Sequence, residues 1–242
     1  MNGALRAVTS ALSRALPILF TARIIGLATL PLLGAALVWT AIAVVAWTPL
    51  TAALARLIGA PAEGAALWQR IAADAAALLM FAALAIATAL AAIAVLTMPV
   101  IVKTVAARHF PGLAAQRGGT VTGSTRNALG ALVAFVPMWL LTLPLLVLPP
   151  LYVAASLALN GWLSQRMFRY DALAEHASND ELATIIRERK TRLLLLGLAL
   201  SPLSLVPIVN VLVLPIYAGI AFTELCLSEL AHRRARAGPV RG

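Results

Sequence analysis

Residues 127–165 read NALGALVAFVPMWLLTLPLLVLPPLYVAASLALNGWLSQ, and this stretch decides the fold class. It holds 39 residues without a charged side chain. A transmembrane helix needs about 20 apolar residues, whereas two complete spans joined by a turn need about 44. Pro144, Pro149 and Pro150 interrupt the run, and each removes a backbone donor from a helix. We therefore predict two shorter helices joined near these prolines, in a hairpin that penetrates the membrane only partly.

Three further uncharged runs cover residues 24–55, 75–102 and 193–223. The whole chain is 62% hydrophobic and 12% charged, whereas a soluble domain is about 25% charged. This composition excludes a soluble globular enzyme, and runs of this length favour helices over the short alternating strands of a membrane barrel. We predict one all-α polytopic membrane domain over residues 1–242.

The other runs differ in how often they cross. Residues 24–55 and 75–102 are predicted to be long transmembrane helices, the first kinked at Pro31. Residues 193–223 contain Pro202 and Pro207, which predict a second partly penetrating hairpin with its tip at these prolines. Open backbone groups at such a tip need protein or water around them, so we expect a homo-oligomer or a polar cavity.

The basic residues indicate the orientation. If both hairpins return to their own side, 17 of the 19 lysines and arginines share one side, and only Arg56 and Arg70 lie opposite. Cytoplasmic loops are rich in Lys and Arg, so we predict that both termini, residues 103–126 and residues 166–192 face the cytoplasm of a bacterial inner membrane. The net charge of +10 then reflects topology and does not indicate nucleic-acid binding.

Residues 1–20 have the periodicity of an amphipathic helix. The pattern suits a helix lying in the headgroup plane as an anchor, although a role in gating is the alternative. The apolar face is predicted to hold Leu5, Val8, Leu12, Leu16 and Leu19, and the polar face Arg6, Ser10, Ser13 and Arg14.

Residues 166–192 form the charged interior segment. Ser178 and Glu181 have the spacing of a capping box, which predicts a helix that starts here and continues into the fourth apolar run. Asp171 is expected to have a structural role as a cap of a preceding short helix. The glycine-rich residues 118–124 are predicted to be a flexible loop, because they lack the spacing and the lysine of a phosphate-binding loop.

Asp, Glu, Lys and His are absent from the four apolar runs, which argues against intramembrane acid–base catalysis. We expect no enzyme activity and no cofactor. His109, His176 and His232 lie in separate polar segments, where surface or interfacial positions are expected and no metal site is predicted.

The last helix carries two acidic residues. Glu224 and Glu229 are expected to pair with Arg233 and Arg234, which follow them closely.

One amide at membrane depth has more than one interpretation. Asn210 follows Pro207 at the second tip, where the next half-helix begins and its free N–H groups favour an anion. The carbonyl end of the preceding half-helix opposes that field. Asn210 therefore either caps the tip or lines a solute path.

The order of elements resembles the family of CysZ, the bacterial sulfate-uptake protein, and of the eukaryotic etoposide-induced membrane protein. The matching residues are Leu30 to Leu33, Met98-Pro99, Phe168 to Asp171, the charged Arg187 to Lys190, and Leu205 to Leu212 followed by Pro215. The resemblance implies two long spans, two partly inserted helical pairs, an oligomer, and passage of sulfate or a related anion.

The family's arginine pair before the first proline-containing span is represented here by Arg23 alone. Its side chain either anchors the helix at lipid phosphates or attracts an anion to the entrance. The leading hypothesis is passive anion passage; the alternative is a membrane scaffold or assembly factor that transports nothing.

Overall fold

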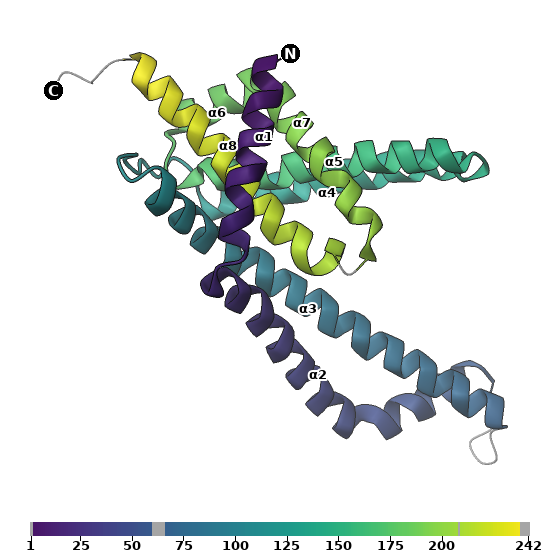
Figure 1. Ribbon diagram of the computed structural model, residues 1–242. Helices are drawn as coiled ribbons and strands as arrows, with labels where there is room; N and C mark the ends of the chain where they lie inside the picture. Colours follow the sequence, from purple (N-terminus) through teal and green to yellow (C-terminus); the bar gives the residue numbers. More distant parts are fainter. Residues whose placement is uncertain (1, 60–65, 208, 238–242) are drawn as a thin grey trace. The chain divides into compact units, whose positions relative to one another are not determined.

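The computed structural model describes residues 2–59, 66–207 and 209–237. These residues are almost entirely helical and form no strand, which confirms the all-α class. Figure 1 shows the helices in chain order. They are α1 (Asn2–Leu19), α2 (Ala22–Leu57), α3 (Leu67–His109), α4 (Val121–Thr142), α5 (Pro149–Ala174), α6 (Asn179–Glu188), α7 (Lys190–Leu200) and α8 (Leu214–Ala237), with short turns η1 (Leu143–Val147), η2 (Ser201–Leu205) and η3 (Val209–Val213).

Within the described part of the chain, four segments are long and apolar enough to cross a membrane. They are Ala22–Leu57, Leu67–Ala89, Val121–Val147 and Leu214–Ala237. The chain forms two compact units, one from residues 1–25 with 97–242 and one from residues 26–96. Each unit is described by itself below.

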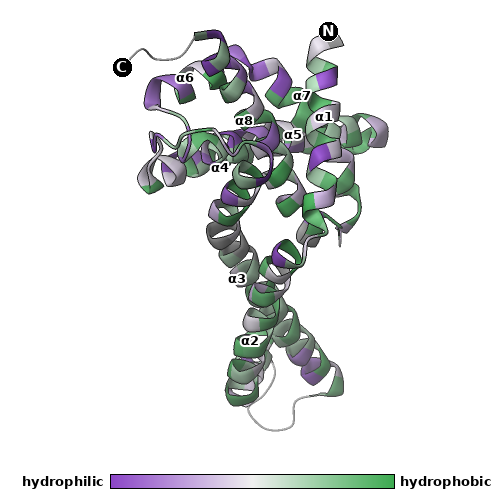
Figure 2. Ribbon diagram, turned by 60° about the vertical axis from the view of Figure 1, so that its left-hand side comes forward, coloured by the Kyte–Doolittle hydropathy of each residue, from purple (hydrophilic) through white to green (hydrophobic). Residues whose placement is uncertain are grey.

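The smaller unit is a pair of long helices, the greater part of α2 and of α3. Its aromatic contacts centre on Phe81, whose ring lies 6.3 Å from that of Trp39 and 6.4 Å from that of Trp47. The indole Nε1–H of Trp39 donates to Thr88 Oγ1 at 3.1 Å. Figure 2 shows that both helices are hydrophobic along most of their length here, and exposed side chains such as Val45 leave that surface to lipid or to another chain.

The larger unit contains the two predicted hairpins. The first is α4, η1 and α5; the helix breaks at Leu148, where φ is −122° and ψ is 81°, and Pro149 and Pro150 open α5. Proline suits the first turn of a helix because the amide it lacks has no partner there. The predicted turn at these prolines is confirmed.

The second hairpin is α7, η2, η3 and α8. Pro202 lies in the first turn of η2, and Pro207 lies just before the π-helical turn η3. Of the most apolar part of α8, 72% is buried, against 6% for α4, so α8 is the core helix of this unit. Its Phe222 stacks on Phe168 of α5 at 5.9 Å.

Two glycines allow α5 and α7 to cross at close range. A Cβ atom on Gly161 would lie 2.9 Å from the backbone N of Leu198, and a Cβ on Gly197 would meet the backbone of Gly161. A methyl group on either residue would therefore force the helices apart.

The flexible loop predicted for residues 118–124 is wrong, because residues 116–119 are held against the end of α5 and residues 121–124 form the first turn of α4. The N–H groups of Arg117, Gly118 and Gly119 donate to carbonyl oxygens of residues 174–177 at 2.9–3.0 Å. The last carbonyl groups of a helix have no partner within it, and these N–H groups satisfy them. Thr120 then caps α4 by accepting from Gly123 N at 3.0 Å.

The charged segment contains the predicted capping box. Glu181 N donates to Ser178 Oγ at 3.2 Å, and Ser178 N donates to Glu181 Oε2 at 2.9 Å. The helix does not continue unbroken into the fourth apolar run, because Arg189 interrupts it with φ −103° and ψ 15°.

Asp171 does not cap a helix. It lies inside α5, which runs without a break to Ala174, and its carboxylate accepts a hydrogen bond from Ser124 Oγ of α4. The role predicted for it as a cap is therefore wrong, because α5 is longer than the sequence indicated. Burial raises the pKa of Asp171, and the Ser124 hydrogen bond opposes that shift.

Candidate anion site

Helix α1 packs through alanine, valine and isoleucine side chains and leaves two leucines exposed. Val8, Ala11, Ala15 and Ile18 are at most 4% exposed, whereas Leu5 and Leu16 are each 49% exposed. The predicted apolar face is thus divided, because Val8 contacts the protein whereas Leu5 and Leu16 do not, and Ala11 and Ala15 allow the backbone of α1 to approach α7 and α8 closely. The leucines are left for lipid, as a helix at the membrane surface requires.

The polar face of α1 forms one wall of a cavity. Arg6, Ser10 and Arg14 recur every four residues and so lie along one side of the helix. The cavity has a volume of about 520 Å³. Its other lining residues are Gly3, Ala7 and Ala11 of α1, Arg189 and Arg192 at the α6–α7 junction, and Glu224, Ser228, Glu229, His232 and Arg236 of α8.

Both glutamates of the cavity already have basic partners. Glu229, 6% exposed, accepts from Arg189 Nε at 2.9 Å and forms a second ion pair with Arg192. Glu224, 2% exposed, contacts His109 at the end of α3. The predicted pairing of these glutamates with Arg233 and Arg234 is wrong. Glu224 and Glu229 point into the unit, whereas the two arginines form ion pairs with glutamates of α6.

Arg234 binds the start of α6. Its Nε and Nη2 donate to the two carboxylate oxygens of Glu181 at 2.9 and 2.8 Å, and Nη2 also donates to the His176 carbonyl at 2.8 Å. The hydrogen bonds from Arg234 hold the pKa of Glu181 below its usual range. Arg233 pairs more loosely with Glu188, at 3.7 Å.

We expected the histidines at the surface or at the membrane interface, but one of them is buried inside the protein. His176 is 6% exposed, and burial lowers its pKa. His109 is partly buried through its contact with Glu224, and His232 is exposed. Among the described residues, no three His, Cys, Asp or Glu side chains gather as a metal site would require.

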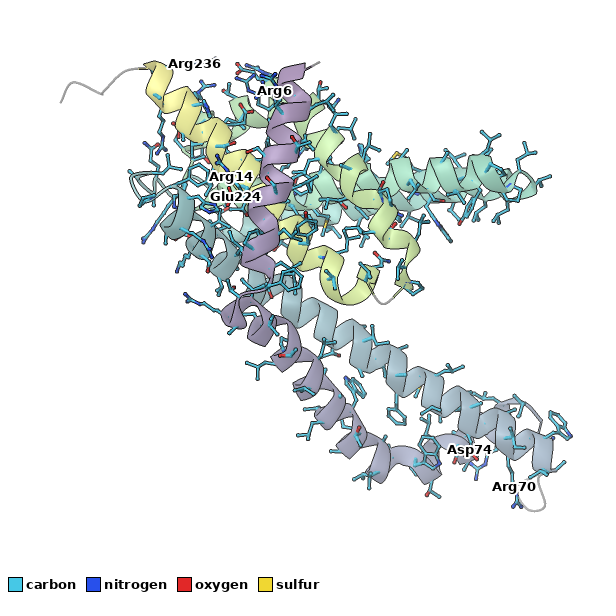
Figure 3. All side chains as sticks on the ribbon, viewed as in Figure 1. Arg6, Arg14, Arg70, Asp74, Glu224 and Arg236 are labelled. Atoms are coloured by element: carbon cyan, nitrogen blue, oxygen red, sulfur yellow. The ribbon has the colours of Figure 1, made fainter. Side chains whose placement is uncertain are left out.

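Three arginines of the cavity form no direct ion pair, although the charge of Arg14 attracts Glu224 from a longer distance. No carboxylate in the described part of the chain lies within ion-pair distance of Arg6, Arg14 or Arg236. Figure 3 shows Arg6 near the N-terminal end of α1 and Arg236 near the C-terminal end of α8, with Arg14 and Glu224 close together further along these helices. Five arginines therefore face two glutamates, which leaves a formal surplus of three positive charges. Planar guanidinium groups fit oxyanions, so the arrangement can attract and hold a small anion.

The two residues predicted for the anion lie elsewhere. Arg23 is exposed in the first turn of α2, and Asn210 is exposed in η3, where its N–H donates to the Val206 carbonyl at 2.8 Å. Neither lines the cavity. A third polar group at depth, Asn160, donates to Ser204 Oγ at 3.4 Å and so joins α5 to η2.

Sequence reasoning missed the cavity itself. The spacing of Arg6, Ser10 and Arg14 showed that a polar face exists. It did not show that this face meets Arg192, which is far away in the chain, and no local pattern carries that information.

Comparison with known families identifies the chain. The family described as sulfate transporter CysZ/etoposide-induced protein 2.4 matches residues 11–215, most of the sequence. The chain belongs to this family. The match and the apolar helices together indicate a membrane protein, and the description of the family names a transporter. Neither the curated proteins nor the solved structures that were compared contain a match.

Proposed function

We propose that this CysZ-family protein lets sulfate, or a related small anion, cross a bacterial inner membrane passively. The observation that carries the proposal is the cavity with its surplus of three arginine charges, in a chain whose family is described as a sulfate transporter. Such a protein needs no catalytic group and no cofactor; its partners are the bilayer and the anion, and nucleic acid is not among them.

Electrostatics supports an anion as the solute. Two unit charges 4 Å apart attract by about 1 kcal/mol in water and by several-fold more beside a low-dielectric wall. Arg6 and Arg14 are exposed while Glu229 is buried, so a solute that enters the cavity meets cations first. With both termini in the cytoplasm, the cavity would lie on the cytoplasmic side of the membrane.

The exposed apolar helices support an oligomer. Leu37 of α2 and Leu141 of α4 are 75% and 77% exposed, and these surfaces suit lipid or a second copy of the chain. We propose that copies assemble side by side and that the hairpin tips, with Pro150 and Pro207, are covered within the assembly.

Uptake of labelled sulfate into proteoliposomes tests the proposal. The purified oligomer should give flux above that of empty liposomes, without ATP. Arg23→Lys keeps the charge but loses the two-pronged guanidinium, so slower uptake by this variant would assign oxyanion recognition to Arg23. Equal uptake by wild type and Arg23→Lys, with slower uptake by Arg23→Gln, would show that Arg23 acts through its charge alone. No flux from an intact oligomer would refute the proposed function.

A scaffold or assembly factor is the second candidate. The single Arg23 favours it, because the arginine pair that the resemblance associates with sulfate is incomplete. A stoichiometric protein partner that co-purifies with the chain, together with absent sulfate flux, would establish this function instead.

A further inference from the structure

The cavity between α1 and α8 has more positive charge than its own residues balance. Glu229 is shared by Arg189 and Arg192, and Glu224 is engaged by His109. Among the described residues, Arg6 and Arg14 form no direct ion pair, and Arg14 only attracts Glu224, which already contacts His109, from a longer distance. Like charges that face one cavity repel one another unless an anion lies between them.

We propose that this cavity binds a tetrahedral oxyanion, with Arg6 and Arg14 of α1 as ligands on one side and Arg192 of α7 on the other. The identification of that oxyanion as sulfate rests on the proposed function. The binding site itself rests on the charge and the geometry of the cavity.

The spacing on α1 suits convergent binding. Arg6 and Arg14 are eight residues apart, about 12 Å along the helix axis, and Ser10 lies between them on the same face. Arginine side chains are long enough to lean toward a group held beside Ser10. The volume of about 520 Å³ accommodates a small oxyanion with water that it brings with it.

A bound anion would also fasten α1 to the rest of its unit. Among the described residues, the helix is otherwise held by its buried face, Val8, Ala11, Ala15 and Ile18, and by one hydrogen bond from Tyr217 Oη to the Leu12 carbonyl at 3.1 Å. An anion that bridges Arg6 and Arg192 would add charge-assisted contacts between α1 and α7. Anion binding should therefore stabilise the docked position of α1.

Two sources could supply this oxyanion: free sulfate and the phosphate of an anionic lipid. The exposed Leu5 and Leu16 of α1 suit a helix near lipid headgroups, so the phosphate must be tested beside sulfate. The two sources differ in whether binding occurs in lipid-free detergent.

The test uses the full-length protein in detergent, titrated calorimetrically with sodium sulfate, and with sodium chloride at matched ionic strength. We expect saturable sulfate binding. Arg6→Gln and Arg14→Gln should each weaken it about tenfold, which corresponds to about 1.4 kcal/mol. Arg187→Gln is the matched control, because Arg187 is exposed on α6 and lines no part of the cavity. It should bind sulfate as the wild type does.

Thermal unfolding of the same variants gives a second measurement. Sulfate should raise the melting temperature of the wild type and of Arg187→Gln, but not that of Arg6→Gln combined with Arg14→Gln. Without sulfate, the double variant should melt close to the wild type, because the repulsion that it removes among the cavity arginines offsets the longer-range attraction between Arg14 and Glu224 that it loses. Phosphatidylglycerol in place of sulfate tests the second source; a shift from the lipid alone, lost in the double variant, would assign the site to a lipid phosphate.

The site is refuted if the double variant keeps wild-type affinity for sulfate and for the lipid, or if Arg187→Gln weakens binding as much as Arg6→Gln does. Failure of the proposed function is separate, since wild-type protein that binds sulfate but gives no flux keeps the site and loses transport. Flux that persists in a double variant without measurable sulfate binding keeps the site and keeps transport, but shows that the site is not on the transport path.

Discussion

Arg234 joins three segments of the larger unit, and its replacement by lysine should destabilise that unit. The guanidinium donates to both carboxylate oxygens of Glu181, to the His176 carbonyl, and through Nη1 to the Ala114 carbonyl at 2.8 Å. Helix α8 is thereby connected to α6, to the α5–α6 turn and to the segment before α4.

The magnitude follows from these hydrogen bonds. A lysine ammonium can keep the ion pair with Glu181, but it cannot reach two carbonyl groups that the planar fork reaches together. Each hydrogen bond from a charged donor contributes about 1.5 kcal/mol, and neighbouring contributions are not additive. We expect Arg234→Lys to cost about 2 kcal/mol, a factor of about 30 in the opening equilibrium of this region.

Hydrogen exchange and thermal unfolding in detergent measure this effect. The amides of Arg117, Gly118 and Gly119 should exchange about 30-fold faster in Arg234→Lys, and the melting temperature should fall by several degrees. Arg233→Lys is the control, because its pair with Glu188 is 3.7 Å long and exposed, and such pairs contribute about 0.5 kcal/mol or less. Equal effects of the two substitutions would refute the central role of Arg234.

The pH dependence has a definite sign. Arg234 lowers the pKa of Glu181 in the folded state, so the ionised Glu181 stabilises the fold. This stabilisation is complete at pH values above the pKa that Glu181 has in the unfolded chain. It disappears as the pH falls through the pKa that Glu181 has in the folded protein. The difference in stability between wild type and Glu181→Gln, measured by thermal unfolding, should therefore shrink in acid.

Three further predictions concern other parts of the chain. Because burial raises the pKa of Asp171, its ionised form opposes folding above that pKa; Asp171→Asn should raise the melting temperature at neutral pH, and the gain should fade in acid. A gain that grows in acid would contradict this. Gly197→Ala should lower the melting temperature strongly, because its Cβ would meet the backbone of Gly161; an unchanged melting temperature would show that α5 and α7 separate easily. A single cysteine at Asn179, in a background without Cys226, should react only with reagents that enter the cytoplasm, and external labelling would overturn the double-hairpin topology.

The parts of this fold that depend on neighbours in the chain could be predicted from sequence. The capping box of Ser178 and Glu181 is a local motif, and prolines such as Pro149 end helices wherever they occur. The length of an apolar run likewise shows whether the segment is long enough to cross the bilayer.

The parts that depend on tertiary contacts could not be predicted in this way. Hydrophobic periodicity showed that α1 has an apolar side, but the packing of Ala11 and Ala15 decided which side meets α8. The partners of Glu229 were predicted from the nearest basic residues in the sequence, whereas the structure supplies Arg189 and Arg192 from another helix. The cavity depends on both features at once, which is why it appears only in three dimensions.

The central claim is that the arginines of the α1–α8 cavity serve the anion that the protein transports. Sulfate uptake by proteoliposomes that contain wild type, Arg6→Gln combined with Arg14→Gln, or Arg187→Gln tests it most directly, at equal amounts of inserted oligomer. We predict that the double variant takes up sulfate at least tenfold more slowly, while Arg187→Gln matches the wild type. Equal uptake by all three proteins would contradict the claim.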